Sequence, residues 1–203
     1  MKNDGSNSTP EFAGISIDRF LAVPLIEVLG TSSVTIPSTY GGRTVYSIGD
    51  NAFNPTESPF GALEGTITIP SSVKNIGASA FRNNPLVTSV VLPENVFITA
   101  RAFRDCGITS LTIPAGTVLD VGTGMAFMNN NITELTYLTT ERQGWREFYG
   151  NPIASITIVA DADITAASGA WGDNGDAFVD YYIGGGSLAG NYLWDGTAWT
   201  GPF

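Results

Sequence analysis

Apolar and polar residues alternate over short stretches along the middle of the chain, and a proline ends most of these stretches. Four segments open with an apolar-x-apolar-Pro group and close with Ala-Phe. The prolines are Pro37, Pro70, Pro93 and Pro114, and the closing aromatics are Phe53, Phe81, Phe103 and Phe127. The phenylalanines follow one another at 28, 22 and 24 residues, and a weaker unit ends 21 residues later at Phe148. With residues 54–65 taken as an insertion, a period of about 22 predicts a stacked repeat array.

Each unit begins with a period-two pattern of three or four residues, which predicts one short strand per coil. The residues expected to face inward are Ile67, Ile69, Val90, Leu92, Leu111, Ile113, Leu135, Tyr137, Ile156 and Ile158. The residues expected to face outward, and to form a candidate binding face, are Thr66, Thr68, Ser89, Val91, Ser110, Thr112, Glu134 and Thr136. Such small side chains make a flat surface, although β-propensity alone also favours Thr in strands.

A second apolar set in each unit predicts the opposite wall of the core. It consists of Val45 with Ile48, Val73 with Ile76, and Val118 with Val121. One coil buries too little apolar surface to be stable, so about three coils must stack before the array folds.

A third periodic position lies three residues after the phenylalanines, where Asn84, Cys106, Asn130 and Asn151 occur. A buried asparagine amide can satisfy the free backbone groups of a tight turn and of the next coil. Cysteine is small and tolerates burial, so Cys106 is interpreted as one member of this ladder. A nucleophilic role for Cys106 is disfavoured, because the chain has no histidine to activate it.

These units resemble the BspA-like class of leucine-rich repeats. The resemblance is carried by Ile69-Pro70, Val73, Ile76-Gly77, Ala80-Phe81 and Asn84, and by the stretch from Ile113-Pro114 to Ala126-Phe127, and it covers about residues 34–158. It implies a repeat solenoid: a right-handed coil with short parallel β-strands, here in about five repeats. The family's members are mostly surface or secreted proteins, and the characterised ones are associated with adhesion. The resemblance therefore implies an extracellular or cell-surface location and a host or cell-surface protein as partner.

The regions outside the array predict a leader, two caps and an end to the repeats. Residues 1–14 read as a flexible leader, 15–33 as an N-terminal cap, 34–159 as the solenoid and 160–203 as a C-terminal capping segment. The unit at 138–148 lacks both the proline and the Ala-Phe pair, as expected where an array ends.

Within the capping segment a helix is predicted from Asp173, its N-cap, to Tyr182, with Phe178 and Tyr182 on one face. A hairpin is predicted around Asp195-Gly196, which suits a two-residue type I′ turn.

The charge of the chain and the residue types that it lacks argue against several classes of function. Nineteen acidic and nine basic residues give a formal charge of −10, which argues against nucleic acid and anionic membrane surfaces as partners. No apolar run approaches the roughly 18 residues of a transmembrane helix. The absence of histidine and the single cysteine remove the common catalytic pairs and transition-metal ligand sets. The sequence thus predicts a non-enzymatic protein without catalytic residues, cofactor or metal.

Three functional hypotheses stay open. The first is a surface or secreted adhesion module that binds a protein partner. The second is a carbohydrate- or cell-wall-binding protein in which Tyr192, Trp194 and Trp199 stack on a glycan, although hairpin aromatics more often pack on each other. The third is a structural fragment of a larger array. A Ca²⁺ site at Asp161 with Asp163, or at Asp173 with Asp176, is weaker than helix capping and solubility as an explanation of these residues.

Overall fold

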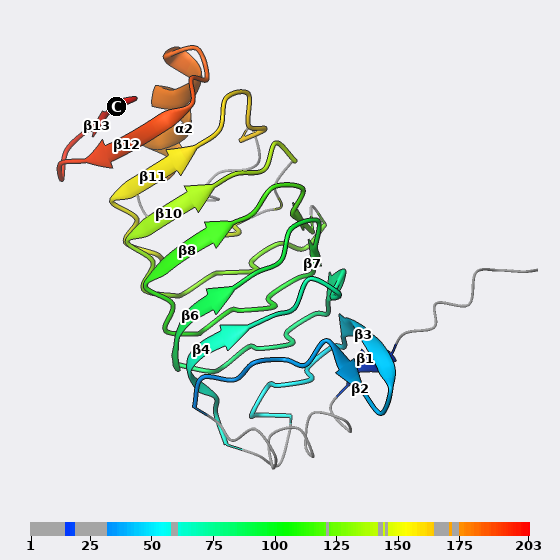
Figure 1. Ribbon diagram of the computed structural model, residues 1–203. Helices are drawn as coiled ribbons and strands as arrows, with labels where there is room; N and C mark the ends of the chain where they lie inside the picture. The colour runs from blue at the N-terminus through cyan, green and yellow to red at the C-terminus, as the bar shows by residue number, and fades with distance from the viewer. Residues whose placement is uncertain are drawn as a thin grey trace, which may run out of the picture.

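The computed structural model describes residues 15–18, 32–57, 61–120, 122–141, 144, 146–164, 171 and 175–203. In these residues the chain forms a β-solenoid with a helix and a hairpin at its C-terminal end (Figure 1). The elements are β1 (Ile15–Ile17), β2 (Thr39–Tyr40), β3 (Arg43–Ile48), β4 (Glu64–Thr68), β5 (Asn75–Ile76), β6 (Leu86–Val91), β7 (Phe97–Ile98), β8 (Ser110–Ile113), β9 (Val118–Leu119), β10 (Glu134–Tyr137), β11 (Ser155–Ile158), α2 (Gly175–Gly184), β12 (Gly190–Trp194) and β13 (Trp199–Thr200). The predicted solenoid of stacked coils with parallel strands and a C-terminal helix and hairpin is confirmed.

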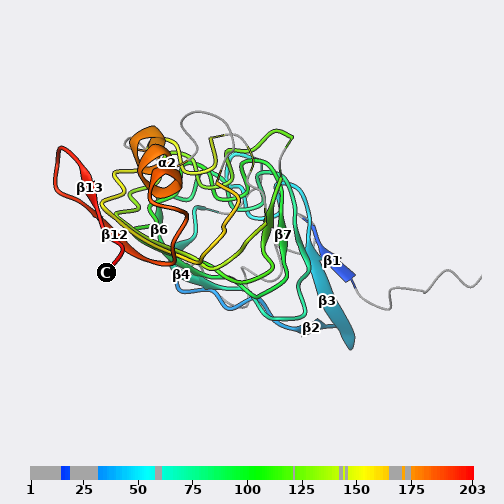
Figure 2. The same cartoon turned by 90° about the horizontal axis from the view of Figure 1, so that it is seen from above.

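One wall of the solenoid is built from the first strand of each coil. β4 pairs with β6, and β8, β10 and β11 pair in parallel before β12 and β13 continue antiparallel. All the residues predicted to face inward from these strands are buried. Figure 2, seen down the stack of coils, shows that this wall and the second sheet lie on different sides of the core.

The second sheet runs in the order β1-β3-β5-β7-β9, with β2 added to β3. Val45, Ile48, Val73 and Ile76 are buried there, as predicted. In the fourth coil the buried position of β9 belongs to Leu119, whereas Val118 is only half-buried. The prediction therefore placed the core residue one position too early, at Val118 in place of Leu119. A strand of two residues shows no alternation, so its sequence does not indicate which residue faces the core. The predicted partner Val121 lies outside the described residues.

The repeat phenylalanines form a continuous column through the core. Phe53, Phe81, Phe103, Phe127 and Phe148 are all fully buried, and adjacent rings are stacked at centroid distances of 5.0, 5.0, 5.2 and 5.8 Å. Each stacked pair contributes about 0.5–1.5 kcal/mol beyond its area burial. The column is the most regular link between neighbouring coils.

The predicted asparagine ladder runs beside this column. The side chains of Asn84, Asn130 and Asn151 are buried, and each amide donates to the carbonyls of its own and the preceding phenylalanine at 2.7–3.0 Å. Each side-chain oxygen also accepts a backbone N–H from the preceding coil, at 2.7–3.1 Å; the donors are Leu63, Ile108 and Ile132. Each of these asparagines thus satisfies three buried backbone groups.

Cys106 occupies the ladder position at which the backbone N–H of the preceding coil needs no acceptor from a side chain. The corresponding N–H, that of Val87, already donates to the carbonyl of Asn84 at 3.0 Å. The Cys106 thiol lies 3.2 Å from the Phe81 carbonyl, in place of an amide donor. A residue without an acceptor therefore fits this coil, and the predicted structural role of Cys106 is confirmed.

The coils turn through residues in the left-handed backbone region on both sides of each phenylalanine. Two residues before the phenylalanine, φ lies between 54° and 67° at Asn51, Ser79, Arg101, Met125 and Arg146. Two residues after it, φ lies between 57° and 73° at Asn83, Asp105, Asn129 and Gly150. Asn, Asp and Gly suit this region, whereas Arg and Met are strained in it by about 1 kcal/mol or more each. Backbone hydrogen bonds between successive coils hold these corners.

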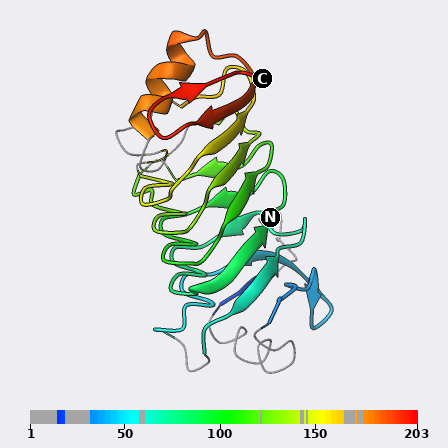
Figure 3. The same cartoon turned by 90° about the vertical axis from the view of Figure 1, so that its left-hand side faces the viewer.

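A helix and a hairpin close the C-terminal end of the core (Figure 3). Helix α2 buries Phe178 and Tyr182 on one face, as predicted, and Phe178 packs against Trp171 at 5.6 Å, which in turn lies 5.6 Å from Phe148. The helix ends in a glycine run where Gly186 has φ of 85°. The predicted N-cap, Asp173, lies outside the described residues.

The hairpin differs from the prediction in its turn. Trp194 pairs with Trp199, so four residues, 195–198, form the loop instead of the two-residue turn Asp195-Gly196. The Asp195 carboxylate accepts hydrogen bonds from the backbone N–H groups of Thr197 and Ala198, both at 2.8 Å, and this cap stabilises the wider loop. β12 also pairs antiparallel with β11, so the hairpin extends the sheet of the solenoid.

The proposed segment boundaries fall partly on residues that are not described. The expected leader 1–14 and most of the expected N-terminal cap lie there, although β1 pairs with β3 and the Ser32–Glu64 and Thr35–Thr68 bridges join this region to β4. The predicted insertion 54–65 overlaps the strand β4, which already begins at Glu64.

Candidate functional site

The outward side chains of the first-strand sheet form two rows across the coils, here called the sheet face. Register places Glu134 beside Ser110 and Ser155, and Thr136 beside Thr112 and Thr157. In the same way Thr66 lies beside Ser89, and Thr68 beside Val91. The structure therefore brings all eight predicted outward residues onto one surface, and none of them is buried.

This face is rich in hydroxyl groups and carries no cation on its strands. From β4 to β13 the strands contain no lysine or arginine, and Glu64 and Glu134 are their charged residues. The Ser32 hydroxyl donates to the Glu64 carboxylate, while Glu134 is exposed. Near the cap, Asn191 accepts from the hydroxyls of Ser155 and Thr157 at 3.0 and 3.2 Å. The face is thus polar, uncrowded and acidic.

The sheet face is interrupted once, between β6 and β8. These neighbouring strands are not paired with each other. Two backbone hydrogen bonds join the chain near the start of each strand: the Gly107 N–H donates to the Val87 carbonyl at 3.0 Å, and the Thr109 N–H donates to the Thr88 carbonyl at 3.2 Å. A cleft of about 310 Å³ opens there, here called the β6–β8 cleft. It is lined by Ser89, Val90, Val91, Leu92, Ser110, Thr112 and Pro114.

One extra residue in the second coil accounts for this interruption. Asn84 precedes Pro93 by nine residues, whereas Cys106 precedes Pro114 by eight. β6 is irregular near its start: Leu86 has 57% of its surface exposed, and the register with β4 skips Thr88, because Gly65 pairs with Val87 and Thr66 with Ser89. Such bulges re-aim side chains and end strand pairing.

The aromatic residues of the hairpin mainly hold the cap together. Tyr192 and Trp199 are 2% and 4% exposed, and both pack edge-to-face on Phe178 at 5.5 and 5.0 Å. Trp194 is half-buried and lies 5.6 Å from Trp199. Stacking on a glycan requires an exposed ring face, and the packing leaves such a face at Trp194 and not at Tyr192 or Trp199.

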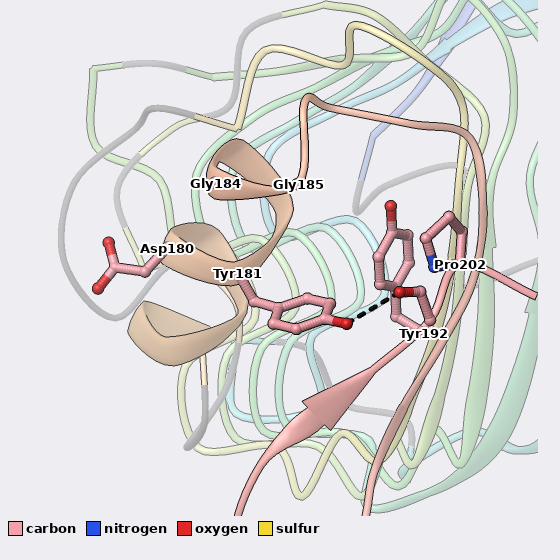
Figure 4. A pocket seen from close by; sticks show the side chains of 7 residues that line it. Asp180, Tyr181, Gly184, Gly185, Tyr192 and Pro202 are labelled. Carbon is pink, nitrogen blue, oxygen red and sulfur yellow. Dashed lines mark hydrogen bonds between the residues drawn. The ribbon is translucent and has the colours of Figure 1, made fainter.

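A separate pocket of about 390 Å³ lies between α2 and the C-terminal segment (Figure 4). The Tyr181 ring points across it toward Tyr192 and Pro202, and its hydroxyl donates to the Gly201 carbonyl at 2.9 Å. Gly184 and Gly185 form part of its wall, and the Asp180 carboxylate points away from the two tyrosines. The pocket is therefore aromatic in character, and sequence reasoning missed Tyr181, whose exposure the pattern does not reveal.

Cys106 and Glu147 are buried titratable side chains of the coils. Burial raises the pKa of the Cys106 thiol to about 12, so the thiol stays protonated and unreactive. Glu147 occupies the position that is alanine in the other coils, and burial raises its pKa to about 8, with the nearby Asp120 adding to the shift. One Glu147 carboxylate oxygen accepts the Ala126 N–H at 2.7 Å. Burial thus favours the neutral form of this carboxyl group.

The acidic residues considered for Ca²⁺ are not assembled into a site in the part of the chain that the structure describes. There, no three His, Cys, Asp or Glu side chains gather closely enough to hold a metal ion. Asp161 is exposed and Asp163 half-buried, while Asp173 lies outside the described residues. Among the described helices, none is long and apolar enough to cross a bilayer.

Comparison with known proteins identifies the family. The family model described as BspA type leucine rich repeat region matches residues 47–167 in six copies, which is more than half of the chain. The match begins later and extends further than the 34–158 inferred from the motifs. Neither a curated protein nor a solved structure matches the chain. The recurring Ile-Pro and Ala-Phe groups, the phenylalanine column and this match together show that the chain belongs to the BspA-type leucine-rich repeat family.

Proposed function

We propose that this protein is a non-enzymatic adhesion module, secreted or displayed at the cell surface, that binds a protein partner through its sheet face. Leucine-rich repeat solenoids are typically protein-interaction scaffolds, and membership of the BspA-type family supports a surface or secreted location. The observation that carries the proposal is the uncrowded face of mostly hydroxyl side chains that strand register builds across β4 and β6 and across β8, β10 and β11.

The rigidity of this face supports a binding role. The phenylalanine column and the asparagine ladder fix each coil against the next, so the hydroxyl rows are held before a partner arrives. A preorganised surface spends less of its interaction free energy on ordering side chains and loops. The buried, protonated Cys106 and Glu147 offer no accessible nucleophile or base that would favour an enzyme.

The proposal is tested by binding measurements on variants of the face. Immobilised protein is exposed by biolayer interferometry to a panel of purified extracellular-matrix and cell-surface proteins. The variant Thr136→Arg places a long cation in the middle of the face and is expected to weaken any saturable binding at least tenfold. Thr44→Arg makes the same change at an exposed position of β3, in the other sheet, and is expected to leave binding unchanged.

Either of two outcomes would contradict the proposal: absence of saturable binding across the panel at low and physiological salt, or equal loss of binding in both variants. Far-ultraviolet circular dichroism and the melting temperature of each variant establish that the fold is retained.

A second candidate function is binding of a glycan at the C-terminal cap. The aromatic pocket between α2 and the C-terminal segment supports it, because pockets of about 300–1,000 Å³ accommodate small ligands and sugars stack on exposed rings. The variants Tyr181→Ala and Trp194→Ala are expected to reduce signals on a glycan array. Leu188→Ala, an exposed apolar position of the same cap, serves as the control. Unchanged signals in the two aromatic variants would exclude this candidate.

A further inference from the structure

We propose that the β6–β8 cleft is a specificity pocket for a lysine or arginine side chain presented by an extended segment of the protein partner. This inference rests on the proposed function, since it names one part of the partner that the sheet face would bind. It concerns strands in which every residue is described, and the four outward residues of the cleft belong to the predicted face: Ser89, Val91, Ser110 and Thr112.

The lining of the cleft matches the shape of an amphipathic cation. Val91, Leu92 and Pro114 supply apolar wall, and Ser89, Ser110 and Thr112 supply hydroxyl groups. Val91 is 51% exposed, an apolar position in a row that is otherwise mostly threonine. Lysine and arginine pack their methylene stems on apolar surface and keep the charged end among polar groups. A purely apolar side chain would leave the hydroxyl side of the cleft without partners.

The charges around the cleft favour a cation. Register places the exposed Glu134 beside Ser110, which lines the cleft. At the other end, the backbone bond from Asn95 to Ala115 brings the loop that carries the exposed Glu94 beside Pro114. The strands of the face contain no lysine or arginine that would compete, and the whole chain has a formal charge of −10. Two acidic residues therefore lie next to residues that line the cleft, Glu134 beside Ser110 and Glu94 in the loop beside Pro114.

The cleft is a consequence of a local departure from the repeat. The other first strands after β6 pair edge to edge in continuous register, and no comparable opening separates β8, β10 and β11. The extra residue of the second coil separates β6 from β8 at one place, so one strand gap differs from its neighbours. A partner that binds in this cleft is fixed at one position along a surface that is otherwise repetitive.

The inference is tested by nuclear magnetic resonance on the full ¹⁵N-labelled chain. The probe is the capped peptide acetyl-Gly-Ser-Lys-Ser-Gly-amide, and matched peptides carry norleucine or glutamate in place of lysine. The lysine peptide is expected to shift the amide signals of Ser89, Ser110 and Thr112 saturably, with millimolar affinity. The norleucine peptide is expected to bind about threefold to fivefold more weakly, which is the upper part of the range for a solvent-exposed ion pair, and the glutamate peptide is expected not to bind.

Two variants at the cleft, each with a matched control, locate the binding site of the peptide. Ser110→Tyr fills the cleft from an exposed position and is expected to abolish the shifts, whereas Thr157→Tyr on the same face leaves them intact. Glu134→Gln is expected to weaken the lysine peptide about threefold and not the norleucine peptide, while Glu57→Gln, in an exposed turn, changes neither. Melting temperatures establish that each variant is folded.

Equal affinity for the lysine and norleucine peptides, or full retention of binding by Ser110→Tyr, would overturn the inference. The proposed function is affected separately. If a protein partner is blocked by Thr136→Arg and not by Ser110→Tyr, the sheet face binds and the cleft has no part in it. If no partner binds but the lysine peptide does, the cleft recognises the cation and the adhesion proposal fails.

Discussion

Replacing Cys106 by asparagine tests the reasoning about the ladder most directly. Repetition alone suggests that asparagine, present at the three equivalent positions, should be accommodated or even stabilising. The structure predicts the opposite, because the backbone group that would donate to the new side-chain oxygen, the Val87 N–H, already donates to the Asn84 carbonyl at 3.0 Å. The new amide nitrogen can share the Phe81 and Phe103 carbonyls, but its oxygen is buried without a donor.

The cost follows from that unsatisfied oxygen. Leaving one buried polar atom without a hydrogen bond costs about 1–3 kcal/mol. At about 2–4 °C per kcal/mol for a chain of this size, Cys106→Asn should melt several degrees below the parent protein. Cys106→Ala, which loses only a weak thiol hydrogen bond and a small volume, should be closer to the parent. Urea unfolding followed by tryptophan fluorescence, with melting by circular dichroism, measures both.

A double-mutant comparison makes the test specific. Deleting Pro85 gives the second coil the spacing of the third and frees the Val87 N–H to face residue 106, as Ile108 faces Asn130. In that background Cys106→Asn should become neutral or stabilising, so the two changes should couple by more than about 1 kcal/mol. If Cys106→Asn stabilises the protein without the deletion, or if its effect is the same in both backgrounds, our explanation of the cysteine is wrong.

Three further predictions address other parts of the coils. Asn130→Ala removes donors to the Phe103 and Phe127 carbonyls and the acceptor for Ile108, and should lower the free energy of unfolding by about 3 kcal/mol or more in urea titrations, while the exposed Asn131→Ala should change it by less than about 0.5 kcal/mol. Met125→Gly relieves a left-handed residue with φ of 67° and should raise the free energy of unfolding by up to about 1 kcal/mol; a lower melting temperature would argue against strain at this corner. The pKa of Glu147 is raised from 4.5 to about 8 in the folded protein, so between these values the folded state holds a proton that the unfolded chain releases. The stability that this group contributes is therefore full below pH 4.5 and is lost as the pH rises through 8. Glu147→Gln should remove this loss, with the difference from the parent growing by at most about 1.4 kcal/mol per pH unit between pH 5 and 8, and a pH-independent difference would contradict it.

Much of the fold was predictable because it repeats. The phenylalanine column and the asparagine ladder recur at fixed offsets, and the alternation in each first strand sets which side chains face the core. Val118 and Leu119 show where this fails, since two residues do not define a phase. The four-residue turn after Trp194 depends on hydrogen bonds of the Asp195 side chain, which compete with the backbone preference of Asp-Gly.

The candidate site was predictable as a surface and not in its detail. Register follows from the strands, so the eight outward residues were found before the structure. The chain has one residue more between Asn84 and Pro93 than between Cys106 and Pro114. This difference can be counted in the sequence, but the sequence does not show that a cleft opens between β6 and β8. Whether Tyr181 or Tyr192 is accessible depends on how the helix packs on the hairpin, and composition carries no information about that.

The reversed direction of β12 has a consequence for how such a protein changes length. A strand that runs against its predecessors presents a different pattern of donors and acceptors to whatever follows it, so the parallel array cannot grow past β11 while the hairpin is in place. Coils can therefore be gained or lost only ahead of the hairpin, for example by duplication of a unit such as residues 82–103, which would carry its own asparagine of the ladder and its own phenylalanine of the column. Lengthening the protein in this way extends the reach of its surface without rebuilding its end.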